Sequence, residues 1–319
     1  MNLLVTGSSG LIGSALLERW LAGGHQATRL VRGTTPHTTE PTSRPTRPPG
    51  GRGAITDVHW DPSQPVIDLD GLEAAGPFDG VVHLAGAGIG DKRWSPARKQ
   101  IVLDSRTDST GLLVTSLLQL APRPPVLISA SAVGFYGEGN DRELTEEAPQ
   151  GRGILAELCG SWERAAAPAA EAGIRTVNLR SGIVLDASGG ALAKMLPIFK
   201  LCLGGKLGSG TQYQSWIALV DEVDIILRAL VDGSVVGPVN ATAPNPVTNA
   251  ELSMAIARAV HRPCFLSVPG AALRLALGSE MANELLLTGQ RALPTRMTSI
   301  GYSFSFPDLD NALRHIVTG

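Results

Sequence analysis

Three glycines near the N-terminus have a spacing typical of loops that hold a dinucleotide. Gly7, Gly10 and Gly13 follow a short apolar stretch, with two residues between one glycine and the next. Glycine lets the backbone turn tightly and approach a pyrophosphate, and the free amides at the start of a following helix attract the anion. We therefore expect a dinucleotide cofactor at this loop. The expected contacts are Gly7, Ser9, Gly10, Leu11, Ile12 and Gly13.

The end of the next apolar stretch distinguishes the nicotinamide cofactors from one another. An NAD site usually has an acidic side chain there, yet no acidic residue occurs between Glu18 and Glu40. The stretch ends at Arg32, whose planar guanidinium can pair with a ribose 2′-phosphate, although arginine at a strand end is also common on surfaces. We expect NADP(H) rather than NAD(H). Asp61, after the third apolar stretch, either hydrogen-bonds the adenine or forms a turn with the proline that follows it.

Several motifs together resemble those of the extended short-chain dehydrogenase/reductase superfamily. Besides the glycine loop, they are His83-Leu84-Ala85-Gly86-Ala87, Ser129-Ala130-Ser131 followed by Tyr136-Gly137, and Arg180-Ser181-Gly182-Ile183-Val184-Leu185. Further stretches, among them Ser105-Arg106 and Gly208-Ser209-Gly210, are similar to the atypical subgroup called epimerase family proteins. The resemblance implies a Rossmann fold. It also implies cofactor contacts from Leu84, Ala85, Gly86, Ser129, Cys159 and Arg180.

The superfamily uses a tyrosine as acid or base, assisted by a lysine four residues later, and this pair is missing here. None of the three tyrosines in the sequence has a lysine at that distance. If Glu163 is the acidic residue one turn after the lysine, the lysine position falls on Cys159 and the tyrosine position on Leu155. A leucine cannot transfer a proton, so the standard mechanism does not carry over to this chain.

Other side chains are candidates for the chemistry that this pair would perform. Ser131 matches the family's catalytic serine and either hydrogen-bonds a substrate carbonyl or is a structural hydroxyl. Tyr136 either supplies a proton or packs in the interior. Cys159 falls near the expected nicotinamide ribose, and without a nearby cation it should remain an inert thiol.

Substrate contacts are expected in a cleft between two lobes. For the large apolar candidates, packing in a hydrophobic core is the competing interpretation. The candidates are Trp94, Met195, Gln212 and Trp216.

Short apolar runs alternate with helical stretches over the first 185 residues. This alternation predicts an α/β fold with a doubly wound parallel sheet of the Rossmann type. The helix that starts after Gly10 should end at Gly23-Gly24, and Ser95-Pro96 should open a long helix. We assign residues 1–187 to a dinucleotide-binding domain. Its expected strands are Asn2–Thr6, Gln26–Val31, Ala54–Trp60, Gly80–Leu84, Pro125–Ala130 and Ile174–Arg180.

Two parts of the chain depart from this alternation. The segment Gly33–Gly53 contains five prolines and six threonines, which predicts a flexible surface insertion, with a flap over the adenosine end of the cofactor as the alternative. From residue 188 onward, glycine-rich loops separate shorter helices and strands. We interpret residues 188–319 as a smaller C-terminal α/β substrate lobe, some of whose elements return to the first domain.

Composition argues against several classes of protein. Lys+Arg 27 against Asp+Glu 29 gives a net charge of -2, which disfavours a nucleic-acid partner. No apolar run approaches the roughly 20 residues of a membrane span, and the N-terminus does not resemble a signal peptide. The three cysteines are too widely spaced for a zinc site or a disulfide framework. We expect a cytoplasmic protein without a membrane partner that acts on a small molecule; its oligomeric state cannot be derived from these features.

Three functions are consistent with these observations. The first is an NADP(H)-dependent oxidoreductase acting on a small carbonyl or hydroxyl substrate. The second is a nucleotide-sugar epimerase or dehydratase, against which the missing tyrosine and Arg32 both count. The third is an NADP(H)-binding sensor without turnover.

Overall fold

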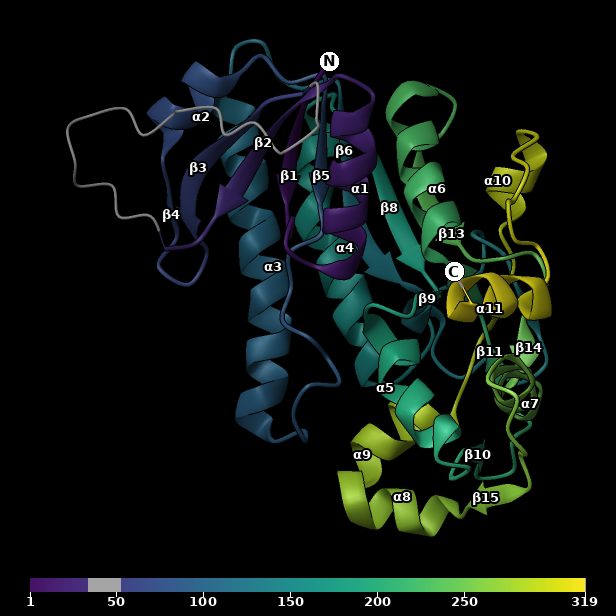
Figure 1. Ribbon diagram of the computed structural model, residues 1–319. Helices are drawn as coiled ribbons and strands as arrows, with labels where there is room; N and C mark the ends of the chain where they lie inside the picture. Colours follow the sequence, from purple (N-terminus) through teal and green to yellow (C-terminus); the bar gives the residue numbers. More distant parts are fainter. Residues whose placement is uncertain (34–52, 319) are drawn as a thin grey trace.

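The computed structural model describes residues 1–33 and 53–318, and its centre is an eight-stranded sheet (Figure 1). The strand order is β13-β8-β6-β5-β1-β2-β3-β4, and β4 alone runs antiparallel to its neighbour. The chain extends the sheet from β1 to β3 and then crosses back to β5 on the other side of β1, so the sheet is doubly wound. The strands are β1 Asn2–Thr6, β2 Gln26–Val31, β3 Ile55–Asp61, β4 Val66–Ile67, β5 Gly80–His83, β6 Val126–Ala132, β8 Arg175–Ser181 and β13 Gly237–Ala241.

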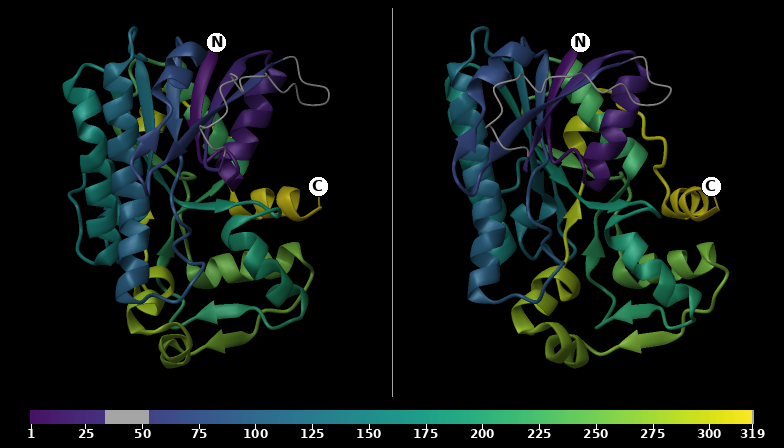
Figure 2. Two further views of the ribbon diagram at one scale, coloured as in Figure 1. Left: turned by 90° about the vertical axis from the view of Figure 1, so that its left-hand side faces the viewer. Right: turned by 60° about the vertical axis from the view of Figure 1, so that its left-hand side comes forward.

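Helices cover both faces of this sheet (Figures 1 and 2). On one face α1 (Leu11–Ala22) and α6 (Leu219–Val231) bury their apolar sides against β1, β6 and β8. On the other face lie α2 (Leu69–Ala75), α3 (Pro96–Gln119) and α4 (Ile154–Glu171). Covering on both faces explains why β1 and β5, at the middle of the sheet, are buried along almost their whole length.

The ends of the helices follow the local signals in the sequence. Ser95 caps α3 by accepting a hydrogen bond from the Arg98 amide at 3.1 Å, and Pro96 occupies the first helical position. Gly24, just after α1, has a φ of +80°, which glycine adopts without strain. The six expected strands of the first half are found within two residues of their predicted bounds.

The C-terminal half forms a second, smaller α/β region around its own core (Figure 2). Trp216 is at the centre of that core, against α5, α7 and α11. Beyond residue 187, β13 joins the large sheet and α6 packs against it. The elements of this half are β9 Ile183–Leu185, α5 Gly190–Lys200, β10 Gly205–Leu207, β11 Tyr213–Gln214, β12 Trp216–Ala218, β14 Val247–Thr248, α7 Asn249–Ala259, β15 Leu266–Val268, α8 Gly270–Leu277, α9 Ser279–Ala282, a π-helical turn Asn283–Leu287, β16 Arg291–Ala292, α10 Thr295–Ser299 and α11 Leu309–Thr318.

The expected insertion Gly33–Gly53 lies almost wholly outside the described residues, since only its two end residues are described. Across the described ranges, no helix has both the length and the apolar character needed to cross a membrane.

Candidate cofactor and active site

The loop between β1 and α1 is built so tightly that two of its glycines cannot be replaced without a shift of the backbone. Gly7 has a φ of +67°, and a Cβ added there would lie 2.6 Å from the carbonyl carbon of Leu84. A Cβ on Gly13 would overlap the carbonyl oxygen of Gly7, whereas one on Gly10 would lie 3.3 Å from it. The loop therefore packs against the segment that follows β5, where Leu84 and Ala85 donate hydrogen bonds to Thr6 Oγ1.

The loop from Gly7 to Gly13, called the cradle below, suits a pyrophosphate. Gly10 is the N-cap of α1, so no side chain caps the amides of the first turn, and the first turn carries no acidic residue. In α2, by contrast, the side chain of Asp68 accepts a hydrogen bond from the Gly71 amide. The residues at the start of α1 thus fit a dinucleotide, for which Gly7, Gly10 and Gly13 would hold the diphosphate.

Two charged side chains lie at the carboxyl ends of β2 and β3. Arg32 follows β2 directly and is exposed. Asp61 ends β3, and its Oδ1 accepts hydrogen bonds from the Ser63 amide at 3.0 Å and the Ser63 hydroxyl at 2.6 Å. These bonds lower the pKa of Asp61. Asp61 thus stabilises a turn through its Oδ1, and the hydrogen bond to an adenine stays a prediction.

A cavity of about 210 Å³ opens at the carboxyl ends of β6 and β8. Its wall includes Leu155 and Cys159 on α4, which is where the tyrosine and lysine positions were placed, together with Ser181 at the end of β8. The C-terminal half closes the cavity from the other side. There, Glu284 accepts hydrogen bonds from the amides of Ile154 and Leu155 and so caps α4.

Arg106 supplies a positive charge to this cavity. Its Nη1 donates to the carbonyl oxygens of Ala87 and Val102, both at 3.0 Å, and its guanidinium lies 4.9 Å from the centre of the Trp162 ring. Gly86 packs beside it, since a Cβ there would lie 3.3 Å from Arg106 Cζ. Gly86, in the loop after β5, therefore lies against the arginine that lines the cavity. Arg106 is not among the predicted site residues, although the Ser105-Arg106 pair was one of the signals of the family resemblance.

Cys159 is a neutral thiol, although the reason expected for this is wrong. A cation does lie nearby, because Arg106 acts to lower the pKa of the thiol. Burial outweighs it, with a smaller contribution from the Glu163 carboxylate, and the pKa of Cys159 is raised to about 12. The thiol can line the cavity, but it supplies neither a thiolate nor a charge.

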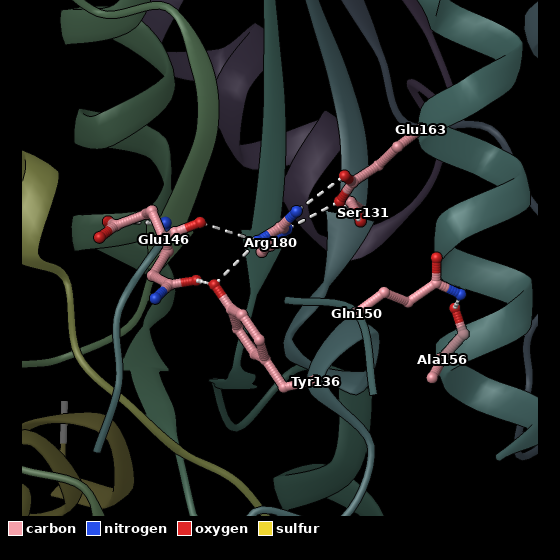
Figure 3. Close-up of polar contacts among 8 residues, drawn as sticks. Ser131, Tyr136, Glu146, Gln150, Ala156, Glu163 and Arg180 are labelled. Carbon is pink, nitrogen blue, oxygen red and sulfur yellow. Dashed lines mark hydrogen bonds and ion pairs between the residues drawn. The ribbon is translucent and has the colours of Figure 1, made fainter. Parts of the chain in front are cut away.

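A buried network beside the cavity engages the polar side chains expected to act in it (Figure 3). Arg180, 3% exposed, donates to both carboxylate oxygens of Glu163, at 2.8 and 2.9 Å. Ser131 donates to the same carboxylate at 2.7 Å. The prediction that Arg180 contacts the cofactor is thus wrong for this structure, and Ser131 has the structural role that was its alternative.

Tyr136 belongs to this network and not to the cavity wall (Figure 3). It is 2% exposed, donates to Asn240 Oδ1 at 2.6 Å and accepts from Arg180 Nη1 at 3.0 Å. Burial raises its pKa. The prediction of Tyr136 as a proton donor is therefore corrected to a packed, hydrogen-bonded residue, because its hydroxyl faces the interior.

Comparison with known proteins identifies the family of this chain. The NAD dependent epimerase/dehydratase family matches residues 3–241, and a domain of unknown function (DUF1731) matches residues 268–316. The chain belongs to the NAD dependent epimerase/dehydratase family. The resemblance to the extended short-chain dehydrogenases and the Rossmann fold expected from it are both confirmed.

Members of this family resemble the chain over nearly its whole length. Epimerase family protein Mb2239 of Mycobacterium bovis is 41% identical over 314 residues, which cover 98% of this chain and 97% of the relative. Epimerase family protein SDR39U1 of Homo sapiens is 35% identical over 321 residues, covering 99% and 100%. The crystal structure of human epimerase family protein SDR39U1 (isoform2) with NADPH has a TM-score of 0.84 at 32% identity and covers 99% of each chain.

Within this family fold, Ser129 lies too deep to contact a cofactor. It is fully buried in β6 opposite His83 of β5, which corrects its assignment as a cofactor contact. His83 itself hydrogen-bonds to Thr6 and Thr110, and burial lowers its pKa to about 3. These central positions stabilise the sheet beneath the site.

Trp94, one of the four predicted substrate residues, lines a second cavity. That cavity, of about 290 Å³, lies between the starts of α3 and α4 and shares Ile89 and Leu158 with the first. Trp216 is fully buried and donates from Nε1 to the Asn245 carbonyl at 3.0 Å, so it belongs to the core. Gln212 donates to two backbone carbonyls, and Met195 packs against the core around Trp216. The predictions for Trp216 and Gln212 are corrected to structural roles, whereas a substrate contact of Met195, which is only partly buried, stays a prediction.

Proposed function

We propose that this protein binds NADP(H) and reduces the carbonyl group of a small, largely apolar molecule. The observation that carries the proposal is the cradle at the start of α1, with Arg32 beyond β2 and the cavity beyond Gly86. The cradle fits a diphosphate, and Arg32 fits a 2′-phosphate. A relative that shares the fold, human SDR39U1, was crystallised with NADPH, which supports the choice of cofactor.

The cavity supports the choice of substrate class. Among the described residues, its wall is mostly apolar and carries one cation, Arg106, and one carboxylate, Glu284, which is engaged as a helix cap. A nucleotide sugar brings two negative phosphates, for which this wall offers little compensation. An uncharged carbonyl compound, or one with a single negative charge facing Arg106, suits it better. Bound NADPH would supply a hydride, and the chain's own residues would hold the carbonyl and provide the proton.

The epimerase alternative requires an acid or base at the tyrosine position, where the cavity wall has Leu155. The sensor alternative remains the competing one, since neither Leu155 nor the neutral Cys159 transfers protons readily.

A binding and turnover experiment separates the three functions. Calorimetric titration should show tighter binding of NADPH than of NADH. NADPH oxidation is then followed at saturating cofactor with aromatic aldehydes, ketones and 1,2-diketones. Oxidation that depends on the carbonyl compound supports a reductase. Tight NADPH binding without turnover of any of these classes would favour the sensor. NAD released from the denatured protein, detected by mass spectrometry, would favour the epimerase.

A further inference from the structure

Behind the wall of the first cavity lies a carboxyl group without a counter-charge. Glu222, in the first turn of α6, is fully buried. Its Oε1 lies 2.5 Å from the hydroxyl oxygen of Ser181, and in the described parts of the chain its Oε2 has no hydrogen-bond partner. An ionised carboxylate with one unpaired oxygen is costly in a dry interior, whereas a neutral carboxylic acid is tolerated. Burial accordingly raises the pKa of Glu222 to about 8.

Among the residues that the structure describes, the elements around Glu222 do not bring a cation to it. On α6 itself, Asp221 accepts hydrogen bonds from the amides of Ser305 and Phe306, with the Tyr302 hydroxyl nearby. Asp224 forms an ion pair with Arg19, the basic residue that α1 brings to α6. The neighbouring strands β6, β9 and β12 consist of uncharged residues. On β8, which carries Ser181, the Arg180 guanidinium pairs with Glu163, and Arg175 donates to backbone carbonyls near the end of α6. The proton on Glu222 is thus retained by burial, which outweighs the opposite effect of the hydrogen bond to Ser181 on the pKa of the carboxyl.

Ser181 connects this carboxyl with the cavity. It is half-buried and lines the same cavity as Leu155 and Cys159. When the carboxyl is protonated, Glu222 can donate to Ser181 Oγ. The hydroxyl hydrogen of Ser181 is then free to turn toward a molecule in the cavity. Glu222 and Ser181 therefore place a transferable proton beside the cavity in which the family's tyrosine is missing.

We propose that Ser181 donates the proton to the substrate oxygen and that Glu222 replaces it from behind. This role rests on the proposed carbonyl reductase function. As the carbonyl carbon accepts a hydride, the C=O π pair moves to oxygen, and that oxygen takes the hydroxyl proton of Ser181. Ser181 Oγ in turn takes the proton of Glu222, which leaves an alcohol and a buried carboxylate. Water that enters the cavity after the product leaves returns a proton to Glu222 through Ser181.

The test begins with a measurement that does not depend on turnover. Infrared difference spectra between the wild type and Glu222→Gln at neutral pH should show the C=O stretching band of a protonated carboxylic acid. The band should shift in Ser181→Ala, because the hydrogen bond is lost. A missing band overturns the proposal, whatever the protein's function.

The second measurement is NADPH oxidation with 1-phenyl-1,2-propanedione as the carbonyl probe. We expect Glu222→Gln and Ser181→Ala each to lower kcat by about a hundredfold or more, the usual contribution of a general acid, with little change in KM. The double variant should be no slower than the slower single one, because the two residues act as a unit. Ser181→Thr should restore most of the rate. The matched control is Asp224→Asn, a carboxyl-to-amide change on the same helix, which should leave kcat unchanged.

The possible outcomes separate this inference from the function on which it rests. If the wild type reduces the diketone and Glu222→Gln does so at the same rate, the relay is wrong and the reductase stands. If the wild type binds NADPH but reduces no carbonyl probe, the proposed function fails and the relay fails with it. Thermal unfolding of each variant, followed by circular dichroism, shows that a lost rate does not come from a lost fold.

Discussion

At the scale of single residues, burial decides the protonation of the groups around the site. It holds Cys159 as a thiol with a pKa of about 12, keeps Glu222 protonated with a pKa of about 8, and keeps His83 neutral with a pKa of about 3. In each case the neutral form is favoured because the low-dielectric interior solvates charge poorly. The buried Arg180 keeps its charge because it pairs closely with Glu163.

Glu222 should make the stability of the protein fall as the pH rises. Its pKa is about 8 in the folded protein against 4.5 ordinarily, so between these values the folded state binds a proton that the unfolded chain has released. The free energy of unfolding should therefore decrease through this window, by up to about 1.4 kcal/mol per pH unit, and level off above it. Urea unfolding across the window should show this component in the wild type and not in Glu222→Gln. An identical pH dependence in the variant would contradict the assignment.

Arg32 should determine the preference for the phosphorylated cofactor. In Arg32→Ala we expect NADPH affinity to fall by roughly 10- to 100-fold, the range of a lost charge-assisted hydrogen bond, and NADH affinity to change little. Fluorescence titration measures both. Arg29→Ala is the matched control, since Arg29 lies on β2, the strand that Arg32 follows, but pairs with Asp57 at 2.7 Å. Equal losses for the two cofactors would rule out the 2′-phosphate contact.

At the scale of elements, two glycines in the turn from β1 into α1 should have different roles. Gly13 is needed for the packing of the loop, and Gly10 for the approach of the ligand. Gly13→Ala places a methyl group on the Gly7 carbonyl oxygen and should cost about 1–3 kcal/mol of stability. Gly10→Ala has more room and an ordinary φ of -77°, so it should fold nearly as well as the wild type. It should nonetheless weaken NADPH, because the methyl group stands where the diphosphate approaches. Denaturant unfolding and cofactor titration of both variants test this, and a Gly13→Ala protein as stable as Gly10→Ala would contradict it.

At the scale of the whole molecule, the buried ion pair between Arg180 and Glu163 joins the sheet to α4 and, through Tyr136, to the segment around Asn240. Glu163→Gln leaves the Arg180 guanidinium buried without its charge partner and should lower the free energy of unfolding by about 3 kcal/mol or more. The exposed pair Arg258–Asp310 is the control, because Arg258→Gln should cost less than about 1 kcal/mol. A loss of similar size in both variants, measured by urea unfolding, would show that burial does not matter here.

Local signals predicted the scaffold well, and the reason is that each one acts within a few residues. The glycine spacing, the Ser95-Pro96 cap and the apolar strands are visible in short windows of sequence, and the structure places them at or near the expected bounds. The sequence also predicted where the tyrosine–lysine pair is missing. The spacing from Glu163 assigns the two positions to Leu155 and Cys159, and both residues line the cavity.

The sequence by itself determined the Rossmann architecture, the cofactor loop and the loss of the family's proton donor. Only the tertiary structure decided which polar side chains face the cavity. Ser131 and Arg180 both bind Glu163 in the interior, and Tyr136 binds Arg180 there. Ser181, by contrast, lines the cavity and has Glu222 behind it. The reason is physical: the direction of a side chain and its burial depend on elements far away in the chain, such as α6 and the segment around Glu284, which no local pattern brings into contact.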